Sequence, residues 1–106
     1  MADAEGIPAL SRERILERLR AHRRTLAEEF GVAELALFGS TARGESEAGS
    51  DVDLMVVLSR PLGWDIVLLR DYLESLLGAP VDLAVRGGLV RRPALWDRVS
   101  RELVYV

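Results

Sequence analysis

The sequence predicts an α/β domain in which helices pack on a small mixed β-sheet. Two segments repeat apolar residues every three or four positions, as amphipathic helices do. Three shorter segments, VAELALF, DVDLMVVLS and PVDLAV, have the length and the β-branched or aromatic content of strands. Helical and strand segments alternate along the chain, and this order is typical of a domain that packs helices against a sheet.

The first predicted helix runs from Ser11 to about Phe30. Ser11 is a suitable N-cap, and residues 1–10 are expected to form a flexible lead. The apolar stripe of this helix has spacings of three and four and consists of Ile15, Leu19, His22, Leu26 and Phe30. Gly31 suits the helix C-cap, and VAELALF then forms the first strand.

The remaining elements follow in short succession. Residues 40–44 are expected to turn into a short helix, and ESEAGS to form a polar loop. DVDLMVVLS is apolar on both faces, which predicts a buried central strand. A helix from Trp64 to Leu77 ends at Gly78, PVDLAV is the third strand, and RGG is expected to be a turn. Pro93 begins a last helix to about Arg101, and LVYV is either a terminal strand or a docked tail.

Length and composition exclude several classes of protein. The 106 residues suit a single domain, 1–106, and the absence of cysteine excludes disulfides, thiolate metal sites and a cysteine nucleophile. No stretch approaches the roughly 18 apolar residues of a membrane span, so a cytoplasmic location is expected. The net charge is −3, and all 14 basic residues are arginine. This charge argues against a strongly basic nucleic-acid-binding surface and leaves a local one open.

Three aspartates are candidates for metal ligands. Asp51 and Asp53 are separated by one residue on a strand, so their side chains share a face, with Cα atoms roughly 6.5 to 7 Å apart. Asp82 occupies the polar position of PVDLAV, and it would join them if the two strands are neighbours. At about 6 Å each like-charge pair would cost on the order of 2 to 3 kcal/mol, and a divalent cation would remove that repulsion.

All-oxygen ligands that leave positions open for a substrate suit Mg²⁺ or Mn²⁺ better than Zn²⁺. Two such ions would promote the in-line displacement of a pyrophosphate leaving group. The alternative is that Asp51 and Asp53 are ordinary strand-start residues that bind nearby backbone.

A possible phosphate-binding turn precedes the aspartates. Gly39 and Ser40 leave the first strand and enter a short helix, so backbone N–H groups and the serine hydroxyl are available to phosphate oxygens. Arg43, one helical turn later, could add a forked cationic contact. The alternative is an ordinary turn with a capping serine and a surface arginine.

The conjunction of these motifs resembles a known signature. Gly39 and Ser40, ten further residues, and then Asp51, Val52 and Asp53 on a strand resemble the motif of the DNA polymerase beta-like nucleotidyltransferase superfamily. Within that superfamily, LALFGSTARGESEAGSDVDLMVV is similar to the minimal nucleotidyltransferase family. The resemblance covers about residues 12 to 106.

The resemblance implies a nucleotidyltransferase fold and a set of site residues. Asp51, Asp53 and Asp82 would bind two Mg²⁺ ions, and Gly39 and Ser40 would contact the nucleotide triphosphate. Arg43 matches the arginine that usually follows the glycine-serine turn, which implies a phosphate contact.

The resemblance also implies a partner. Proteins of this family are similar to antitoxins that transfer AMP from ATP to a tyrosine of a HEPN ribonuclease toxin. Two other functions remain open: a non-catalytic antitoxin that occludes its partner or senses nucleotide, and a nucleic-acid-modifying subunit, which the acidic charge disfavours. Association as a homodimer or with the helical toxin is expected.

Several other residues are assigned structural roles. His22 is expected at the edge of the core. Trp64 and Trp96 are expected in the core or, for Trp64, at the mouth of the active site or a partner surface. We expect solvent-exposed positions for the charged side chains near the last helix and in the loop between the motif halves, namely Arg91, Arg92, Arg98, Glu45 and Glu47. The alternatives are a partner-contact region formed by these arginines with Tyr105 of the C-terminal tail, and an approach of the two glutamates to a metal.

Overall fold

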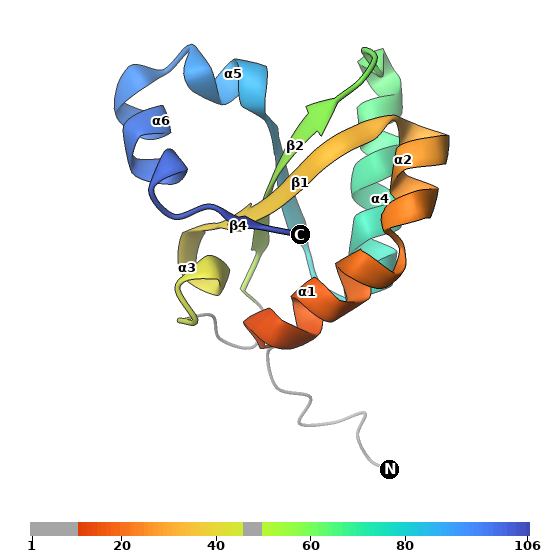
Figure 1. Cartoon of the computed structure of the whole chain (residues 1–106), viewed down its shortest axis with the longest axis horizontal. Coiled ribbons are helices and arrows are strands. Elements are labelled where there is room, and N and C mark those ends of the chain that lie inside the picture. The colour runs from red at the N-terminus through yellow and green to blue at the C-terminus, as the bar shows by residue number, and fades with distance from the viewer. Residues whose placement is uncertain (1–10, 46–49) are drawn as a thin grey trace.

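The computed structural model describes residues 11–45 and 50–106, in which helices cover both faces of a β-sheet (Figure 1). The expected lead at 1–10 lies outside these residues. The elements in chain order are α1 (Arg12–Ala21), α2 (Arg23–Phe30), β1 (Val32–Phe38), α3 (Gly39–Ala42), β2 (Val52–Leu58), the 3₁₀ turn η1 (Gly63–Asp65), α4 (Ile66–Leu77), β3 (Val81–Val85), α5 (Arg86–Val90), α6 (Pro93–Ser100) and β4 (Val104–Tyr105).

The sheet is mixed, as the sequence predicts. Its strand order is β3-β2-β1-β4, with β1 antiparallel to both β2 and β4, and β2 parallel to β3. The C-terminal LVYV segment therefore supplies a terminal strand, which settles the alternative left open above. The register places Phe38 of β1 opposite Asp53 of β2, and Asp53 opposite Asp82 of β3.

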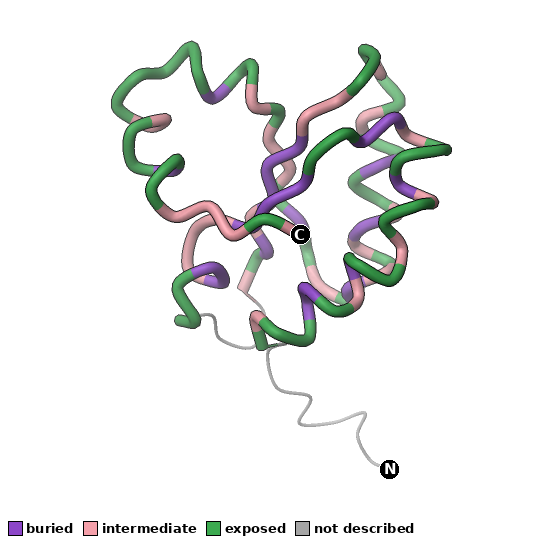
Figure 2. Tube along the Cα trace, viewed as in Figure 1, coloured by how far each residue is buried: buried purple, intermediate pink, exposed green. Residues whose placement is uncertain are grey.

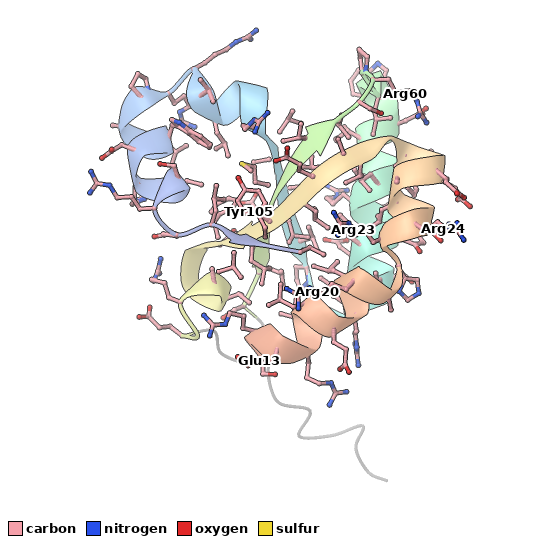
Figure 3. The ribbon with its side chains drawn as sticks, viewed as in Figure 1. Glu13, Arg20, Arg23, Arg24, Arg60 and Tyr105 are labelled. Atoms are coloured by element: carbon pink, nitrogen blue, oxygen red, sulfur yellow. The ribbon has the colours of Figure 1, made fainter. Side chains whose placement is uncertain are left out.

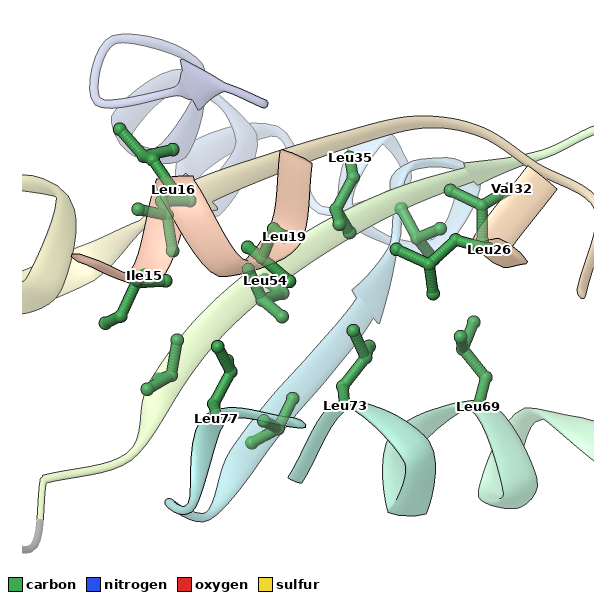
Figure 4. Close-up of a cluster of buried hydrophobic side chains, with 14 of the residues drawn as sticks. Ile15, Leu16, Leu19, Leu26, Val32, Leu35, Leu54, Leu69, Leu73 and Leu77 are labelled. Atoms are coloured by element: carbon green, nitrogen blue, oxygen red, sulfur yellow. The ribbon is translucent and has the colours of Figure 1, made fainter. Parts of the chain in front are cut away.

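One face of the sheet carries the larger core. Strand side chains alternate between faces, so Leu35 and Leu37 of β1 lie on the same side as Leu54 and Val56 of β2. Helices α1, α2 and α4 cover this side. Figure 4 shows the buried leucines that they contribute: Leu16, Leu19, Leu26, Leu69, Leu73 and Leu77. Figure 2 shows the buried positions concentrated in the strands and on the inner sides of these helices.

The opposite face carries a smaller core beneath α5 and α6. Ala36 of β1 and Met55 of β2 are fully buried there against Leu89 and Val99. Figure 1 shows α5 and α6 on one side of the strands, with α1, α2 and α4 on the other. The molecule thus has three layers, and the thinner layer of α5 and α6 leaves room for a cavity at one end of the sheet.

The first helix differs from the prediction, because it breaks at His22. The backbone of His22 leaves the helical region, with φ −110° and ψ 14°, and divides the expected segment into α1 and α2. Leu19 of α1 and Leu26 of α2, on either side of this break, are both buried in the larger core. The His22 ring lies 3.0 Å (Nδ1) from the Arg18 carbonyl oxygen and edge-on to Tyr72, so its placement at the core edge is confirmed.

One further expectation was wrong, and the structure excludes one of the alternatives for Trp64. The RGG segment is the start of helix α5 and not a turn, because the helical path carries Leu89 onto the small core. The core position is excluded for Trp64, which lies in η1 directly before α4 and is 91% exposed. Trp96 packs, half-buried, against the small core.

The predicted helix caps at Ser11, Gly31 and Gly78 are confirmed. The Ser11 hydroxyl accepts a hydrogen bond from the Arg14 backbone N–H at 3.2 Å, and Gly31 and Gly78 end α2 and α4 in the left-handed conformation.

A hydrogen bond connects α1 to the C-terminal strand. In Figure 3 Arg20 reaches from α1 toward Tyr105, whose carbonyl oxygen accepts a hydrogen bond from the Arg20 guanidinium group at 3.4 Å. No helix within the described ranges is long and apolar enough to cross a membrane.

The two sides of α4 give a test of the core. Leu73 is completely buried and Leu68 is 58% exposed. We expect Leu73→Ala to lower the free energy of unfolding by about 3 kcal/mol, because it opens a cavity among the leucines. Leu68→Ala should change it by less than about 0.5 kcal/mol. Urea denaturation followed by circular dichroism measures both, and equal losses would contradict this packing.

Candidate active site

A cavity of about 710 Å³ opens at the end of the sheet where β1 ends and where β2 and β3 begin. Its walls come from three parts of the chain. The strands contribute Asp53, Asp82 and Ala84, and the turn after β1 contributes Gly39, Ser40 and Arg43. The third wall comes from α5 and α6 and the residues beside them: Leu89, Arg92, Leu95, Arg98, Val99 and Glu102.

Asp53 and Asp82 are brought together by strand pairing. They are direct neighbours in the parallel β2–β3 register, where strands run about 4.8 Å apart. Asp53 shares a strand face with Met55, which is buried under α5 and α6, so its carboxylate points into the layer that holds the cavity. Asp51 precedes β2, is exposed and does not line the cavity.

The carboxyl group of Asp53 is electrostatically unusual. Partial burial, and then the negative charges of Asp82 and Asp51, raise the pKa of Asp53 to about 6. A hydrogen bond with Asp82 and the charge of Glu102 act in the same direction. Asp51 therefore belongs to the same charged cluster, although it stands outside the cavity lining. Crowded carboxylates with a raised pKa are typical of functional sites.

This cluster has the chemistry of a site for a divalent cation. In the part of the chain described, no three acidic or histidine side chains already stand in a metal-binding arrangement. Asp53 and Asp82 nevertheless offer adjacent oxygen donors whose mutual repulsion a cation would remove. An all-oxygen donor set fits Mg²⁺ or Mn²⁺.

Gly39 connects the two halves of the motif. Its φ of +74° is unfavourable for any residue with a Cβ atom, and a Cβ there would collide with Oδ2 of Asp53 and lie 3.0 Å from its Cγ. The backbone of the turn therefore lies directly against the Asp53 carboxylate. The β1–β2 register causes this approach, because Phe38, the residue before Gly39, is paired with Asp53.

A carboxylate from the C-terminal segment also binds this turn. Glu102 accepts a hydrogen bond from the Gly39 N–H at 2.9 Å and one from Arg43 Nη1 at 2.8 Å. Arg43 donates a further hydrogen bond from Nε to Glu45 at 3.0 Å. The Gly39 amide and Arg43 thus form a site that holds an anionic group, as the sequence predicts for a phosphate. Here that anion is Glu102.

The structure gathers most of the predicted residues around one cavity. Gly39, Ser40, Arg43, Asp53 and Asp82 all line it. Glu45 is exposed, as expected, and its carboxylate also pairs with Arg43, whereas Glu47 lies outside the described residues.

Sequence reasoning missed Glu102 and the cavity-facing positions of Arg92 and Arg98. A helical spacing was available as a signal, because Arg92, Leu95, Val99 and Glu102 recur at intervals of three and four.

Residues 19–106 match the nucleotidyltransferase domain family. The chain therefore belongs to this family, and it is a nucleotidyltransferase domain. It is 42% identical over 98 residues to the protein adenylyltransferase MntA of Thermococcus cleftensis, covering 92% of this chain and 97% of the relative. A Methanocaldococcus jannaschii protein, provisionally named a protein adenylyltransferase, is 37% identical and covers 83% of this chain and 90% of its own.

Solved structures confirm the fold. A structure provisionally assigned as a minimal nucleotidyltransferase superposes with a TM-score of 0.74 at 34% identity, covering 90% of this chain and 95% of the other. A toxin–antitoxin structure with AMP-PNP superposes with a TM-score of 0.60, covering 91% of this chain and 72% of the other. At 24% identity the second likeness is one of fold.

The contact between Gly39 and Asp53 can be tested with two alanine variants. Gly39 and Gly44 both have positive φ, but only Gly39 has a neighbour that a Cβ would meet. Each Gly→Ala change should cost about 1 kcal/mol of folding free energy for the backbone conformation. Gly39→Ala should lose at least about 1 kcal/mol more, because the turn must move away from Asp53. Equal losses in urea denaturation would show that the close approach does not exist.

The raised pKa of Asp53 makes the stability of the metal-free protein depend on pH. The folded state favours the neutral form of the Asp53 carboxyl group over the charged form. The contribution of this group to the free energy of unfolding is therefore complete below its unfolded pKa of about 3.8. It is lost as the pH rises through about 6. The shift sets a ceiling of about 3 kcal/mol, which solvent screening reduces to about 1 kcal/mol at this partly exposed group.

Between about pH 5 and 7.5, in the presence of a chelator, the wild type should therefore lose more thermal stability than Asp53→Asn. Adding Mg²⁺ or Mn²⁺ at the higher pH should restore the wild type and leave the variant nearly unchanged. Differential scanning fluorimetry measures both effects, and parallel pH curves for the two proteins would contradict the assignment.

Proposed function

We propose that this domain transfers AMP from ATP to a hydroxyl group of a partner protein. One observation carries the proposal: the Gly39–Ser40 turn and the Asp53–Asp82 pair line a single cavity, with the turn held against Asp53. In this arrangement groups able to donate to phosphate oxygens lie beside carboxylates able to bind a cation, which supports the proposal. The adenylyltransferase name of the Thermococcus cleftensis relative, which matches almost end to end, supports AMP as the transferred group.

Each motif residue has a role in this reaction. Asp53 and Asp82 would hold two Mg²⁺ ions together with Asp51, whose charge acts on Asp53. Gly39 and Ser40 bind phosphate oxygens of ATP through the backbone N–H and the hydroxyl group. Arg43 binds a phosphate when it releases one of its two carboxylate partners, Glu45 or Glu102.

The chemistry is an in-line displacement at the α-phosphorus. The acceptor hydroxyl oxygen forms a bond to that phosphorus, the bond to the bridging oxygen of the β-phosphate breaks, and pyrophosphate leaves. Asp82 is exposed at the cavity and accepts the hydroxyl proton. Cations held at these carboxylates would neutralise charge on the triphosphate and lower the pKa of the acceptor hydroxyl.

The partner that we propose is a HEPN ribonuclease toxin, with a tyrosine as the acceptor. Toxin–antitoxin complexes contain proteins of this fold, and one such structure is of a tri-AMPylated HEPN toxin with its MNT antitoxin. The open cavity leaves the acceptor to be supplied by another chain. AMP groups on a tyrosine near an RNA-binding surface would repel RNA by charge and block it by bulk.

A second candidate is an antitoxin that neutralises its partner by occlusion alone. The exposed apolar side chains of Trp64 and Leu68, four positions apart on η1 and α4, favour a contact surface that does not involve the cavity. The two functions differ in one requirement. Only transfer needs ATP and Mg²⁺.

We expect the intact mass of the partner to increase by whole AMP units when it is incubated with this protein, ATP and Mg²⁺. Asp53→Asn with Asp82→Asn should abolish the increase, because the cation ligands are lost while the charge repulsion that opposes folding is relieved. Asp71→Asn, at an exposed position on α4, should transfer AMP at the wild-type rate. Mass spectrometry of the partner is the measurement.

Two results would contradict the transfer reaction. One is a mass increase that persists in the Asp53→Asn, Asp82→Asn variant. The other is an unchanged mass combined with full inhibition of the partner when ATP and Mg²⁺ are left out, which would establish the occlusion function.

A further inference from the structure

The cavity has charges of opposite sign on different walls. The strands contribute the carboxylates of Asp53 and Asp82, and the region of α5 and α6 contributes the guanidinium groups of Arg92 and Arg98. Arg43 and Glu102 form an ion pair between these walls, so their charges are largely balanced by each other. The cavity therefore has an acidic side and a basic side.

Arg92 and Arg98 differ from several other arginines of the chain in having no ion-pair partner among the described residues. Arg101 is paired with Asp97, Arg86 with Glu34, and Arg43 with both Glu45 and Glu102. Within residues 11–45 and 50–106, the guanidinium groups of Arg92 and Arg98 make no hydrogen bond or ion pair. They are exposed to the cavity with their donors available.

Their position follows from the packing of α6. Val99 is buried in the small core, and Leu95 packs beside it, which fixes the rotation of the helix on the sheet. Arg92 is the N-cap residue of α6, three residues before Leu95, and Arg98 is three residues after it. This spacing puts both arginines on the side of α6 that faces the cavity.

We propose that Arg92 and Arg98 bind the phosphate groups of the nucleotide triphosphate. The proposal rests on the proposed function, and it assigns to α6 a role in substrate binding. A triphosphate whose cations are held by Asp53 and Asp82 still presents several negatively charged oxygens. Arg43 cannot balance them alone because two carboxylates share it. Guanidinium groups bind phosphate oxygens through paired hydrogen bonds, and Arg92 and Arg98 are the cavity arginines with free donors.

The test is the affinity for α,β-methylene ATP in the presence of Mg²⁺, measured by isothermal titration calorimetry. This analogue binds without being cleaved between the α- and β-phosphates. Arg92→Gln and Arg98→Gln should each weaken binding about tenfold, since each removes hydrogen bonds to a charged group. Binding of the analogue by the double variant Arg92→Gln, Arg98→Gln should also depend less on salt concentration than binding by the wild type.

The matched control is the double variant Arg91→Gln, Arg101→Gln. It removes the same charge from the same segment, but neither residue lines the cavity. We expect this control to bind the analogue as the wild type does. Thermal melting of all variants checks that they remain folded. If the double variant Arg92→Gln, Arg98→Gln is unstable, the affinity of the single variant Arg98→Gln decides the test.

The outcomes separate this proposal from the proposed function. If the wild type binds and Arg92→Gln, Arg98→Gln binds equally tightly, the arginine assignment is wrong while the transfer reaction stands. If the two double variants weaken binding equally, the effect is one of net charge and the assignment is also wrong. If the wild type does not bind the analogue at all, the proposed function itself fails.

Discussion

The antiparallel pairing of β1 with β2 is the constraint on which the site depends. It sets Phe38 opposite Asp53, so the chain leaves β1 at the point where the carboxylate stands. Only glycine can follow Phe38 there, because the backbone has a positive φ and a Cβ would occupy the space of the carboxylate oxygen. A shift of one residue in this register would turn Asp53 to the other face and separate the two halves of the motif.

The second strand pair and the small core complete the arrangement. Parallel pairing of β2 with β3 puts Asp82 beside Asp53, and a bound cation would remove the repulsion between their carboxylates. Met55, two residues along β2 from Asp53, is buried under α6, so the same strand face is apolar in its middle and acidic at its end. The hydrophobic layer therefore holds α6 at the edge of the charged site.

Glu102 connects the C-terminal strand to this site. Its carboxylate joins the Gly39 amide and Arg43, while the backbone a few residues later pairs β4 with β1. In the proposed reaction the triphosphate uses the same donors, so nucleotide binding and the contacts of Glu102 are coupled. This coupling explains why a phosphate contact by Arg43 requires a rearrangement, whereas Arg92 and Arg98 need none.

The sequence by itself determined the fold class, the strands and most of the motif residues, because these depend on local patterns. The Gly39–Ser40 turn, the Asp51 and Asp53 pair and the caps at Ser11, Gly31 and Gly78 can all be recognised from residue type and spacing. The tertiary structure decided the break at His22, the helix at Arg86–Val90, and the cavity positions of Glu102, Arg92 and Arg98. These features involve packing against the sheet and contacts between residues about 60 positions apart, such as that between Gly39 and Glu102, and no local pattern encodes such contacts.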